Sequence, residues 1–455
     1  MRVSKKSKNG KNKRIGKHLS RLFAVALSLL LVGGIPLKGE AAGPGVSSES
    51  AVVMDIDSGA ILYAKNMDTK HYPASITKVM TALVALEHYE LSDMIGFTWD
   101  DVGFLEYNDA HIGLTPGEEI TFEHAMYGML LASANEVSHA IGRNVEGGYE
   151  AFLQMMNEKA AELGCKNSHF MNTHGLHDEE HYVSAYDMAL IGAAAFQHEF
   201  FRTVIASLQH SIPETNLVNE KRVFQQNHKM VFDWRTEYYE YCVGGKTGYT
   251  PQAQTTLVTF AQKDGVNLVA VVLKADGGSK AYKDTKALLE YGFNSFSKTI
   301  VSADMVEVKG LKSIQEDAYV MLSEGITFDQ LAADIQYPTE FEDKTGTIVY
   351  THDGWVVGKV EFTITDAYYN ELHGIKEPEE KKPSQKKDSP AMDILLIVVK
   401  VILWLIFIVV ILYLLLVCYA IYKRKQKRKR KAELRRQRRE QEYRRYVRQM
   451  QDDEE

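Results

Sequence analysis

A long apolar segment near the C-terminus constrains the organisation of this 455-residue chain more than any other feature. Residues 394–422 are almost entirely apolar, and they exceed the roughly 20 residues that a membrane-spanning helix requires. A dense run of Lys and Arg follows at once and continues into the tail, residues 423–455. Because basic residues stay on the cytoplasmic side of a membrane, we expect a transmembrane helix with a basic cytoplasmic tail and an external body.

The N-terminus carries the features of a secretory signal peptide, residues 1–41. Its first part is basic, Leu22–Val32 is a short apolar run, and the small residues Gly39 and Ala41 suit cleavage. An uncleaved anchor is the alternative. Residues 374–393 are charged and contain Pro without an apolar period, which predicts a flexible tether before the membrane helix.

Charge is distributed unevenly along the chain. The net charge of −7 combines basic ends with a strongly acidic body. Charge alone would let the basic tail bind nucleic acid. A basic segment that begins at a membrane helix is more simply explained by attraction to anionic lipid, so we expect no nucleic-acid partner.

The body is predicted to form a mixed α+β domain over 42–298 and a small β-rich domain over 299–373. Strand patterns at both ends of the first region enclose helical patterns, so its terminal strands should pair in one antiparallel sheet flanked by helices. Alternating residues dominate the second region. The predicted elements of the first region are a hairpin over 50–65, helices over 74–89, 122–131, 149–163, 186–196 and 280–296, and strands over 255–261 and 266–273.

Ser75 and Lys78 lie three residues apart at the start of the predicted helix 74–89. Residues at i and i+3 share a helix face, so the serine hydroxyl and the lysine amine should lie within hydrogen-bond reach. A neutral lysine can act as the base that activates a serine nucleophile. The pattern alone is weak, because it recurs at Ser295 and Ser384.

Two further short motifs follow in order. Ser133 and Asn135 come after an apolar helix, where the serine can relay protons and the amide can orient a lysine and a substrate; a simple helix cap is the alternative. Lys246, Thr247 and Gly248 offer a charge and a hydroxyl to a terminal carboxylate, and the glycine lets a substrate backbone lie close; an ordinary turn is the alternative.

The ordered set of three motifs resembles that of the penicillin-recognising serine acyltransferases, which are named by these motifs. The flanking residues, above all 72–75, 129–136, 172–176 and 245–250, are similar to those of low-molecular-mass penicillin-binding proteins that are D-alanyl-D-alanine carboxypeptidases. The likeness covers about residues 45–298. It implies a β-lactamase/transpeptidase-like fold and a place on the outer face of the bacterial cell membrane.

The resemblance also implies a reaction. The enzyme would remove the terminal D-alanine from peptidoglycan stem peptides through an acyl-enzyme on Ser75, limiting crosslinking during cell-wall synthesis. No metal or organic cofactor is implied, and β-lactams should acylate the same serine. The catalytic residues would be Ser75, Lys78, Ser133 and Asn135, and the substrate-binding residues Lys246, Thr247, Gly248 and Tyr249.

Two departures from the family pattern concern carboxylate binding. Gln254 follows Ala253 where the family usually has a small Ala-Gly pair. The arginine that many members supply from the next strand is absent, and Lys274 or Lys280 are the candidates to replace it, although a lysine lacks the planar guanidinium fork.

Several other polar residues are not assigned to catalysis. Asn172 and His174 are interpreted as loop architecture at the edge of the cleft. The histidines of this region lack ordered ligand spacing, so we expect no zinc site. Cys165 and Cys242 are expected to be free thiols.

Rival functions remain open at this point. A β-lactamase-like hydrolase would share the motifs and add an acidic residue that activates water. A non-catalytic sensor or scaffold would bind penicillin or peptide without turnover, although the tail is short for a signalling domain. The sequence leaves open whether the substrate is the monomeric precursor or crosslinked wall, whether an amine competes with water, and the oligomeric state.

Overall fold

The computed structural model describes residues 43–339 and 344–375. The predicted signal peptide, tether, membrane helix and basic tail lie outside these residues. Among the helices that the structure describes, none is long and apolar enough to cross a membrane. A boundary between two domains near residue 298 stays a prediction, because the described residues belong to one compact unit.

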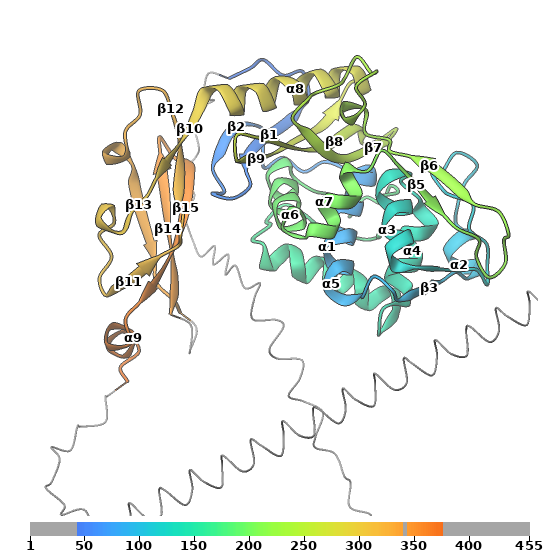
Figure 1. Ribbon diagram of the computed structural model, residues 1–455, viewed down its shortest axis with the longest axis horizontal. Coiled ribbons are helices and arrows are strands. Elements are labelled where there is room, and N and C mark those ends of the chain that lie inside the picture. The colour runs from blue at the N-terminus through green and yellow to red at the C-terminus, as the bar shows by residue number, and fades with distance from the viewer. Residues whose placement is uncertain (1–42, 340–343, 376–455) are drawn as a thin grey trace, which may run out of the picture. The chain divides into compact units, whose positions relative to one another are not determined.

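A five-stranded antiparallel sheet lies at the centre of the fold, in the order β2-β1-β9-β8-β7 (Figure 1). The N-terminal strand β1 pairs with β9, with Val52 opposite Val271, so the predicted pairing of distant strands is confirmed. The turn after β1 is the predicted hairpin, with Gly59 at φ 68°. The strands are β1 (Ser50–Asp55), β2 (Ile61–Lys65), β7 (Cys242–Thr250), β8 (Gln254–Lys263) and β9 (Val266–Ala275).

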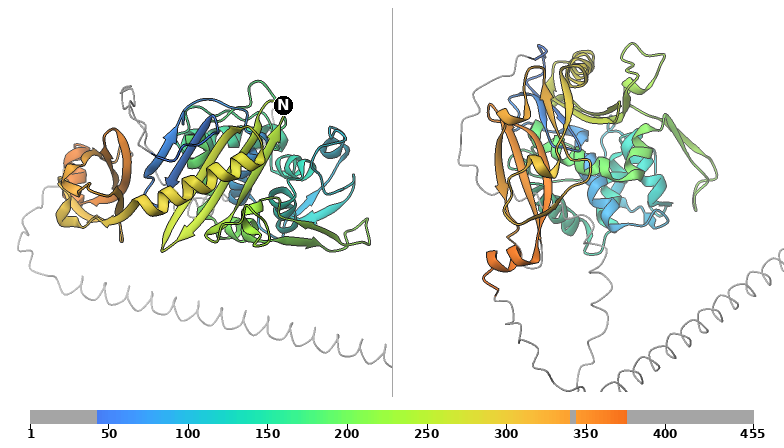
Figure 2. Two further views of the ribbon diagram at one scale, coloured as in Figure 1. Left: turned by 90° about the horizontal axis from the view of Figure 1, so that it is seen from above. Right: turned by 60° about the vertical axis from the view of Figure 1, so that its left-hand side comes forward.

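Helices cover both faces of this sheet because its central strands are apolar on both sides. Along β9, Val269 and Val271 point into one core cluster and Ala270 and Val272 into another, as strand alternation requires. The helix α8 (Gly278–Ser295) packs on the second side and crosses the strands in Figure 2. The first side is covered by α6 (Ala185–Gln197) and by the other helices of the domain.

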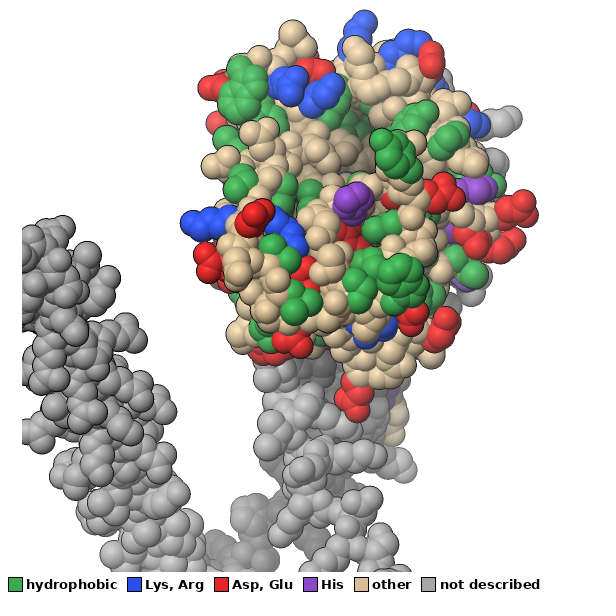
Figure 3. Space-filling view, turned by 90° about the vertical axis from the view of Figure 1, so that its right-hand side faces the viewer, with side chains coloured by type: hydrophobic (Ala, Val, Ile, Leu, Met, Phe, Trp, Pro, Cys, Tyr) green, Lys and Arg blue, Asp and Glu red, His purple; other side chains and the backbone are tan. Residues whose placement is uncertain are grey.

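The helices on the first side include those that carry the sequence motifs. Their bounds are η1 (Ala74–Thr77), α1 (Lys78–His88), α2 (Trp99–Val102), α3 (Phe122–Leu131), α4 (Asn135–Asn144), α5 (Gly148–Glu162) and α7 (Glu199–Ala206), while the short η2 (Lys229–Val231) packs Met230 into the core of the second side. Two small hairpins accompany them: β3 (Met94–Gly96) with β4 (Glu119–Thr121), and β5 (Gln209–Ile212) with β6 (Arg222–Gln225). Figure 3 views the side on which β5 and β6 lie, where Lys and Arg are scattered among acidic and apolar side chains.

The region after α8 is rich in strands, as its alternating sequence predicts. One sheet pairs β10 with β12, and a second has the order β11-β15-β14-β13. The Tyr319 hydroxyl donates to the buried Asp55 carboxylate of β1 at 2.8 Å. The elements are β10 (Phe296–Ile300), η3 (Ala303–Met305), β11 (Leu311–Ile314), β12 (Tyr319–Ser323), η4 (Phe328–Gln330), β13 (Ala332–Gln336), β14 (Thr345–His352), β15 (Trp355–Ile364) and α9 (Asp366–Leu372).

Candidate active site

Ser75 and Lys78 meet at the junction of two helix types. The predicted helix 74–89 begins as the 3₁₀ turn η1, and α1 starts at Lys78. Side chains at i and i+3 eclipse one another in a 3₁₀ helix, so Lys78 Nζ lies 3.2 Å from Ser75 Oγ. Ala74, directly before the serine, has φ 51°, a conformation that a non-glycine residue adopts only when its surroundings hold it.

Lys78 is placed to act as a base. Its side chain is fully buried, and Nζ lies 2.7 Å from Asn135 Oδ1 and 2.6 Å from the His174 carbonyl oxygen. Burial, and then the charge of Lys246, hold the pKa of Lys78 well below its usual value. A neutral amine donates two hydrogen bonds and accepts one, so the two short contacts leave its lone pair for the Ser75 hydroxyl.

Ser133 and Lys246 form a second pair in the same site. Lys246 Nζ donates to Ser133 Oγ at 2.9 Å and to its neighbour's carbonyl, that of Thr247, at 2.8 Å. Ser133 has φ 65°, which turns the chain sharply between α3 and α4. Burial lowers the pKa of Lys246 to about 7, so both the charged and the neutral amine are accessible near neutral pH.

Asn135 is the first residue of α4 and contacts the first of the two pairs. Its side-chain oxygen accepts from Lys78, and its backbone N–H donates to the Ala110 carbonyl at 2.8 Å. Ala110 and the preceding Asn108 and Asp109 line the same pocket as Ser75. Sequence reasoning missed this loop, since no motif marks it.

The strand β7 forms the opposite wall of the pocket. A Cβ atom on Gly248 would lie 2.4 Å from Thr256 Oγ1 and 2.9 Å from the Ser75 nitrogen, so only glycine fits beside the nucleophile. Thr247 and Tyr249 also line the pocket, and Tyr249 is 69 % exposed at its rim. The pocket has a volume of about 490 Å³, which suits a short peptide end.

The three sequence motifs thus lie around one pocket. Comparisons with known proteins identify the family that shares them. A model of the D-alanyl-D-alanine carboxypeptidase family matches residues 38–277. The chain belongs to this family. The match favours the carboxypeptidase interpretation over a β-lactamase-like hydrolase and over a sensor or scaffold.

Curated proteins that are similar in sequence to this chain are also D-alanyl-D-alanine carboxypeptidases. The chain is 28% identical over 339 residues to the D-alanyl-D-alanine carboxypeptidase DacF of Bacillus subtilis, covering 69% of this chain and 83% of the relative. It is 30% identical over 268 residues to DacC of Escherichia coli, covering 56% and 63%.

Solved structures show the same architecture. The D-alanyl-D-alanine carboxypeptidase of Mycobacterium tuberculosis matches with 27% identity and a TM-score of 0.51, over 57% of this chain and 96% of that one. The Streptomyces K15 DD-transpeptidase matches with 24% identity and a TM-score of 0.51, over 56% and 99%, and shows the fold. The predicted α+β, transpeptidase-like fold is therefore confirmed.

The departures from the carboxypeptidase family pattern have structural counterparts. Gln254 has φ 55°, the conformation that favours glycine, which explains why a small residue is usual there. Neither candidate for the missing arginine lines the catalytic pocket: Lys274 pairs with Glu49 at 2.8 Å, and Lys280 pairs with Asp276, four residues before it. The replacement of the arginine by either lysine stays a prediction, and a third lysine, Lys229, which pairs with Glu237 at 3.3 Å, lines the pocket.

Residues that the sequence analysis set aside take other roles. Asn172 Oδ1 accepts from the Gly175 N–H, which fixes a loop, and a Cβ on Gly175 would lie 1.9 Å from the Ala74 carbonyl oxygen. This loop presents the His174 carbonyl to Lys78. Cys165 and Cys242 are free thiols. Within residues 43–339 and 344–375, no group of three metal-ligating side chains is close enough to hold an ion.

Proposed function

We propose that this protein removes the terminal D-alanine from peptidoglycan stem peptides by a serine acyl-enzyme mechanism, which limits crosslinking during cell-wall synthesis. The observation that carries this proposal is the continuous network from Ser75 through Lys78 to Asn135, beside the Ser133–Lys246 pair. Family membership supports the reaction and the substrate class.

Acylation begins at Ser75. Neutral Lys78 accepts the hydroxyl proton while Oγ attacks the carbonyl carbon between the two D-alanines. The backbone N–H groups of Ser75 and Tyr249 hold the oxyanion, each contributing about 3–4 kcal/mol. Collapse of the tetrahedral species breaks the C–N bond, and Ser133 passes a proton to the leaving nitrogen while the proton that Lys78 took from Ser75 replaces it, which returns Lys78 to its neutral form.

The residues around the catalytic pocket also determine how the substrate binds. Lys246 and Thr247 bind the carboxylate of the leaving D-alanine, and Asn135 donates its side-chain N–H₂ to the acyl amide. Gly248 lets the peptide backbone lie against β7. Water then hydrolyses the ester with Lys78 as base, which restores the serine. A β-lactam presents a carboxylate and an amide in similar places and acylates Ser75.

The location of the protein is also proposed. Sequence alone supports a catalytic region on the outer side of the bacterial cell membrane, held by a single helix over 394–422, with the basic tail 423–455 against anionic lipid in the cytoplasm. This placement would bring the site to the wall that the reaction requires.

Release of D-alanine tests the proposed activity. The purified full chain is incubated with a peptide ending in D-Ala-D-Ala, and free D-alanine is followed for the parent, Ser75→Ala and Ser295→Ala. Ser295 begins a second Ser-x-x-Lys match at the end of α8 and is the matched control. We expect release from the parent and from Ser295→Ala only. Equal release from Ser75→Ala would overturn the proposal.

A further inference from the structure

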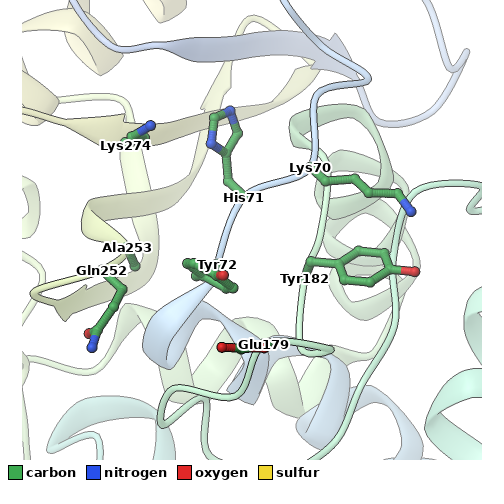
Figure 4. A pocket seen from close by; sticks show the side chains of 8 residues that line it. All are labelled: Lys70, His71, Tyr72, Glu179, Tyr182, Gln252, Ala253 and Lys274. Atoms are coloured by element: carbon green, nitrogen blue, oxygen red, sulfur yellow. The ribbon is translucent and has the colours of Figure 1, made fainter.

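A second cavity of about 320 Å³ is lined by residues outside the three motifs. Figure 4 shows Tyr72 and Glu179 in its middle, with Gln252 toward one side and Tyr182 toward the other. None of the residues of the three motifs contributes to its lining, although Lys274, a candidate to replace the missing arginine, does.

The cavity adjoins the catalytic pocket. Three chain segments each place one residue in the catalytic pocket and another, two or three positions away, in the second cavity. The two spaces therefore lie next to each other along these three segments. The pairs are Ser75 with Tyr72, Leu176 with Glu179, and Thr250 with Gln252.

The direction of β7 indicates which part of the substrate reaches this cavity. Lys246 and Thr247, the proposed carboxylate site, come before Gly248, which lies beside the nucleophile. The strand then continues through Thr250 to the turn at Gln252. Each residue advances about 3.3 Å, so the substrate residues that precede the D-alanine pair lie along the end of the strand, toward the cavity.

The positive groups at the cavity already have partners. Lys274 pairs with the Glu49 carboxylate at 2.8 Å, and Lys70 Nζ lies 4.0 Å from the centre of the Tyr182 ring. His71 bonds through Nε2 to the Ser50 hydroxyl, and burial lowers the pKa of the imidazole, so it adds no charge near neutral pH.

Within the part of the chain that the structure describes, two polar side chains that line the cavity are without a partner and can accept hydrogen bonds, Glu179 through its carboxylate and Gln252 through its amide oxygen. Among the described residues, no hydrogen bond or ion pair engages the Glu179 carboxylate or the Gln252 side-chain amide. Figure 4 draws the ring of Tyr72 above both side chains. A carboxylate, an amide oxygen and an aromatic ring together suit an ammonium group, which donates hydrogen bonds and is attracted to the ring.

We propose that this cavity binds the free primary amine at the end of the side chain of the stem-peptide residue that precedes the two D-alanines. The inference rests on the proposed function, because it assumes that the peptide lies along β7. A wall crosslink is formed by acylating such an amine, which removes its charge. Stem peptides that are not crosslinked through this amine are therefore the preferred substrates.

Two peptides that differ in one acetyl group test the inference. The purified full chain is given Nα-acetyl-L-Lys-D-Ala-D-Ala or the same peptide acetylated at Nε as well, and kcat/KM is measured for both. We expect the free amine to give a value about three- to tenfold higher, mainly through a lower KM, with the ratio falling as salt rises.

A charge-removing pair of variants identifies the acceptor. Glu179→Gln should bring the ratio close to one and leave kcat/KM for the doubly acetylated peptide unchanged. Glu180→Gln removes the neighbouring exposed carboxylate, which does not line the cavity, and should keep the parent ratio.

The outcomes separate this inference from the proposed function. Release of D-alanine from both peptides at equal rates, or a ratio that survives Glu179→Gln, would overturn the amine site and leave the carboxypeptidase intact. Release from neither peptide, with no labelling by a fluorescent penicillin, would contradict the proposed function and this inference with it.

Discussion

Two buried lysines, each bonded to a serine that lines the catalytic pocket, set the chemistry of this site. Each is costly to charge, and the charge of Lys246 further disfavours that of Lys78. The two lysines therefore have different roles. Lys78 is neutral and acts as the base, while Lys246, next to Ser133, binds the carboxylate of the substrate. A bound carboxylate would favour the charged form of Lys246, and that charge would favour the neutral form of Lys78.

The lysine coupling predicts a pH effect. Lys246→Gln removes a positive charge, so the pKa of Lys78 should rise and less neutral amine should be present at a given pH. The acidic limb of the rate of acylation by a penicillin should therefore move to higher pH, by roughly half to one unit. The measurement is the second-order labelling rate between pH 5 and 9. A limb that stays in place or moves to lower pH would contradict the coupling.

Gly248 predicts a steric effect at the nucleophile. In Gly248→Ala the new methyl would meet Thr256 Oγ1 and the Ser75 nitrogen, and the serine must move. Because misplacement by about 1 Å costs roughly a hundredfold in rate, D-alanine release should fall by about that factor. Gly45→Ala, where nothing lies within 4 Å of the added carbon, is the control. Unchanged activity in Gly248→Ala would show that the contact is not restrictive.

At the scale of single residues, the sequence predicted the residues that react but not the other residues that line the pocket. The motifs predicted Ser75 with Lys78 and Ser133 with Lys246, and the structure places each pair within hydrogen-bond distance. Lys229 and the loop at Asn108 reach the same pocket through tertiary packing alone, which leaves no local pattern.

At the scale of elements, the short helix α2 supports α4, which carries Asn135. Asp101 of α2 is fully buried and accepts from His139 Nδ1 at 2.8 Å and from Arg143 at 2.9 Å, both on α4. These bonds outweigh the effect of burial and lower the pKa of Asp101 to about 2. The carboxylate therefore stabilises the fold above its ordinary pKa, and this contribution is lost as the pH falls from about 4 to about 2.

Asp101→Asn should destabilise the protein at neutral pH by about 2–3 kcal/mol, since it leaves the buried end of Arg143 without its counter-charge. Urea unfolding measures the change. Asp100→Asn, at the exposed neighbouring position, should shift the free energy of unfolding by less than about 0.5 kcal/mol. Equal effects from the two substitutions would contradict the structural role of Asp101.

Periodicity predicted most of the long elements, missed the ten-residue helix α4, and predicted the short elements poorly. Helices α3, α5, α6 and α8 and the hairpins of the central sheet fall where the apolar pattern places them. The 3₁₀ start at Ser75 was not foreseen, because i and i+3 spacing is shared by both helix types. The helices α2 and α7 and the hairpin β5–β6 are too short for a period to stand out.

At the scale of the whole molecule, the chain combines a carboxypeptidase site with a C-terminal sequence, residues 394–455, that predicts membrane attachment. We expect the full chain to sediment with membranes and a chain ending at residue 393 to appear in the soluble fraction, because residues 394–422 would supply the anchor. Fractionation with an antibody to the body measures both. A full chain that stays soluble would contradict the anchor.

Attachment also bears on which substrates are within reach. A site held near the membrane meets newly added wall first, where many stem amines are still free. This agrees with the preference proposed for the cavity at Glu179.

The position of the acyl group tests the central claim most directly. The full chain is treated with a penicillin, digested, and its peptides are analysed by mass spectrometry. The account predicts an adduct on the peptide that contains Ser75, absent from Ser75→Ala and still formed, more slowly, in Ser133→Ala. An adduct on Ser133 or on any other residue, or labelling that persists in Ser75→Ala, would contradict it.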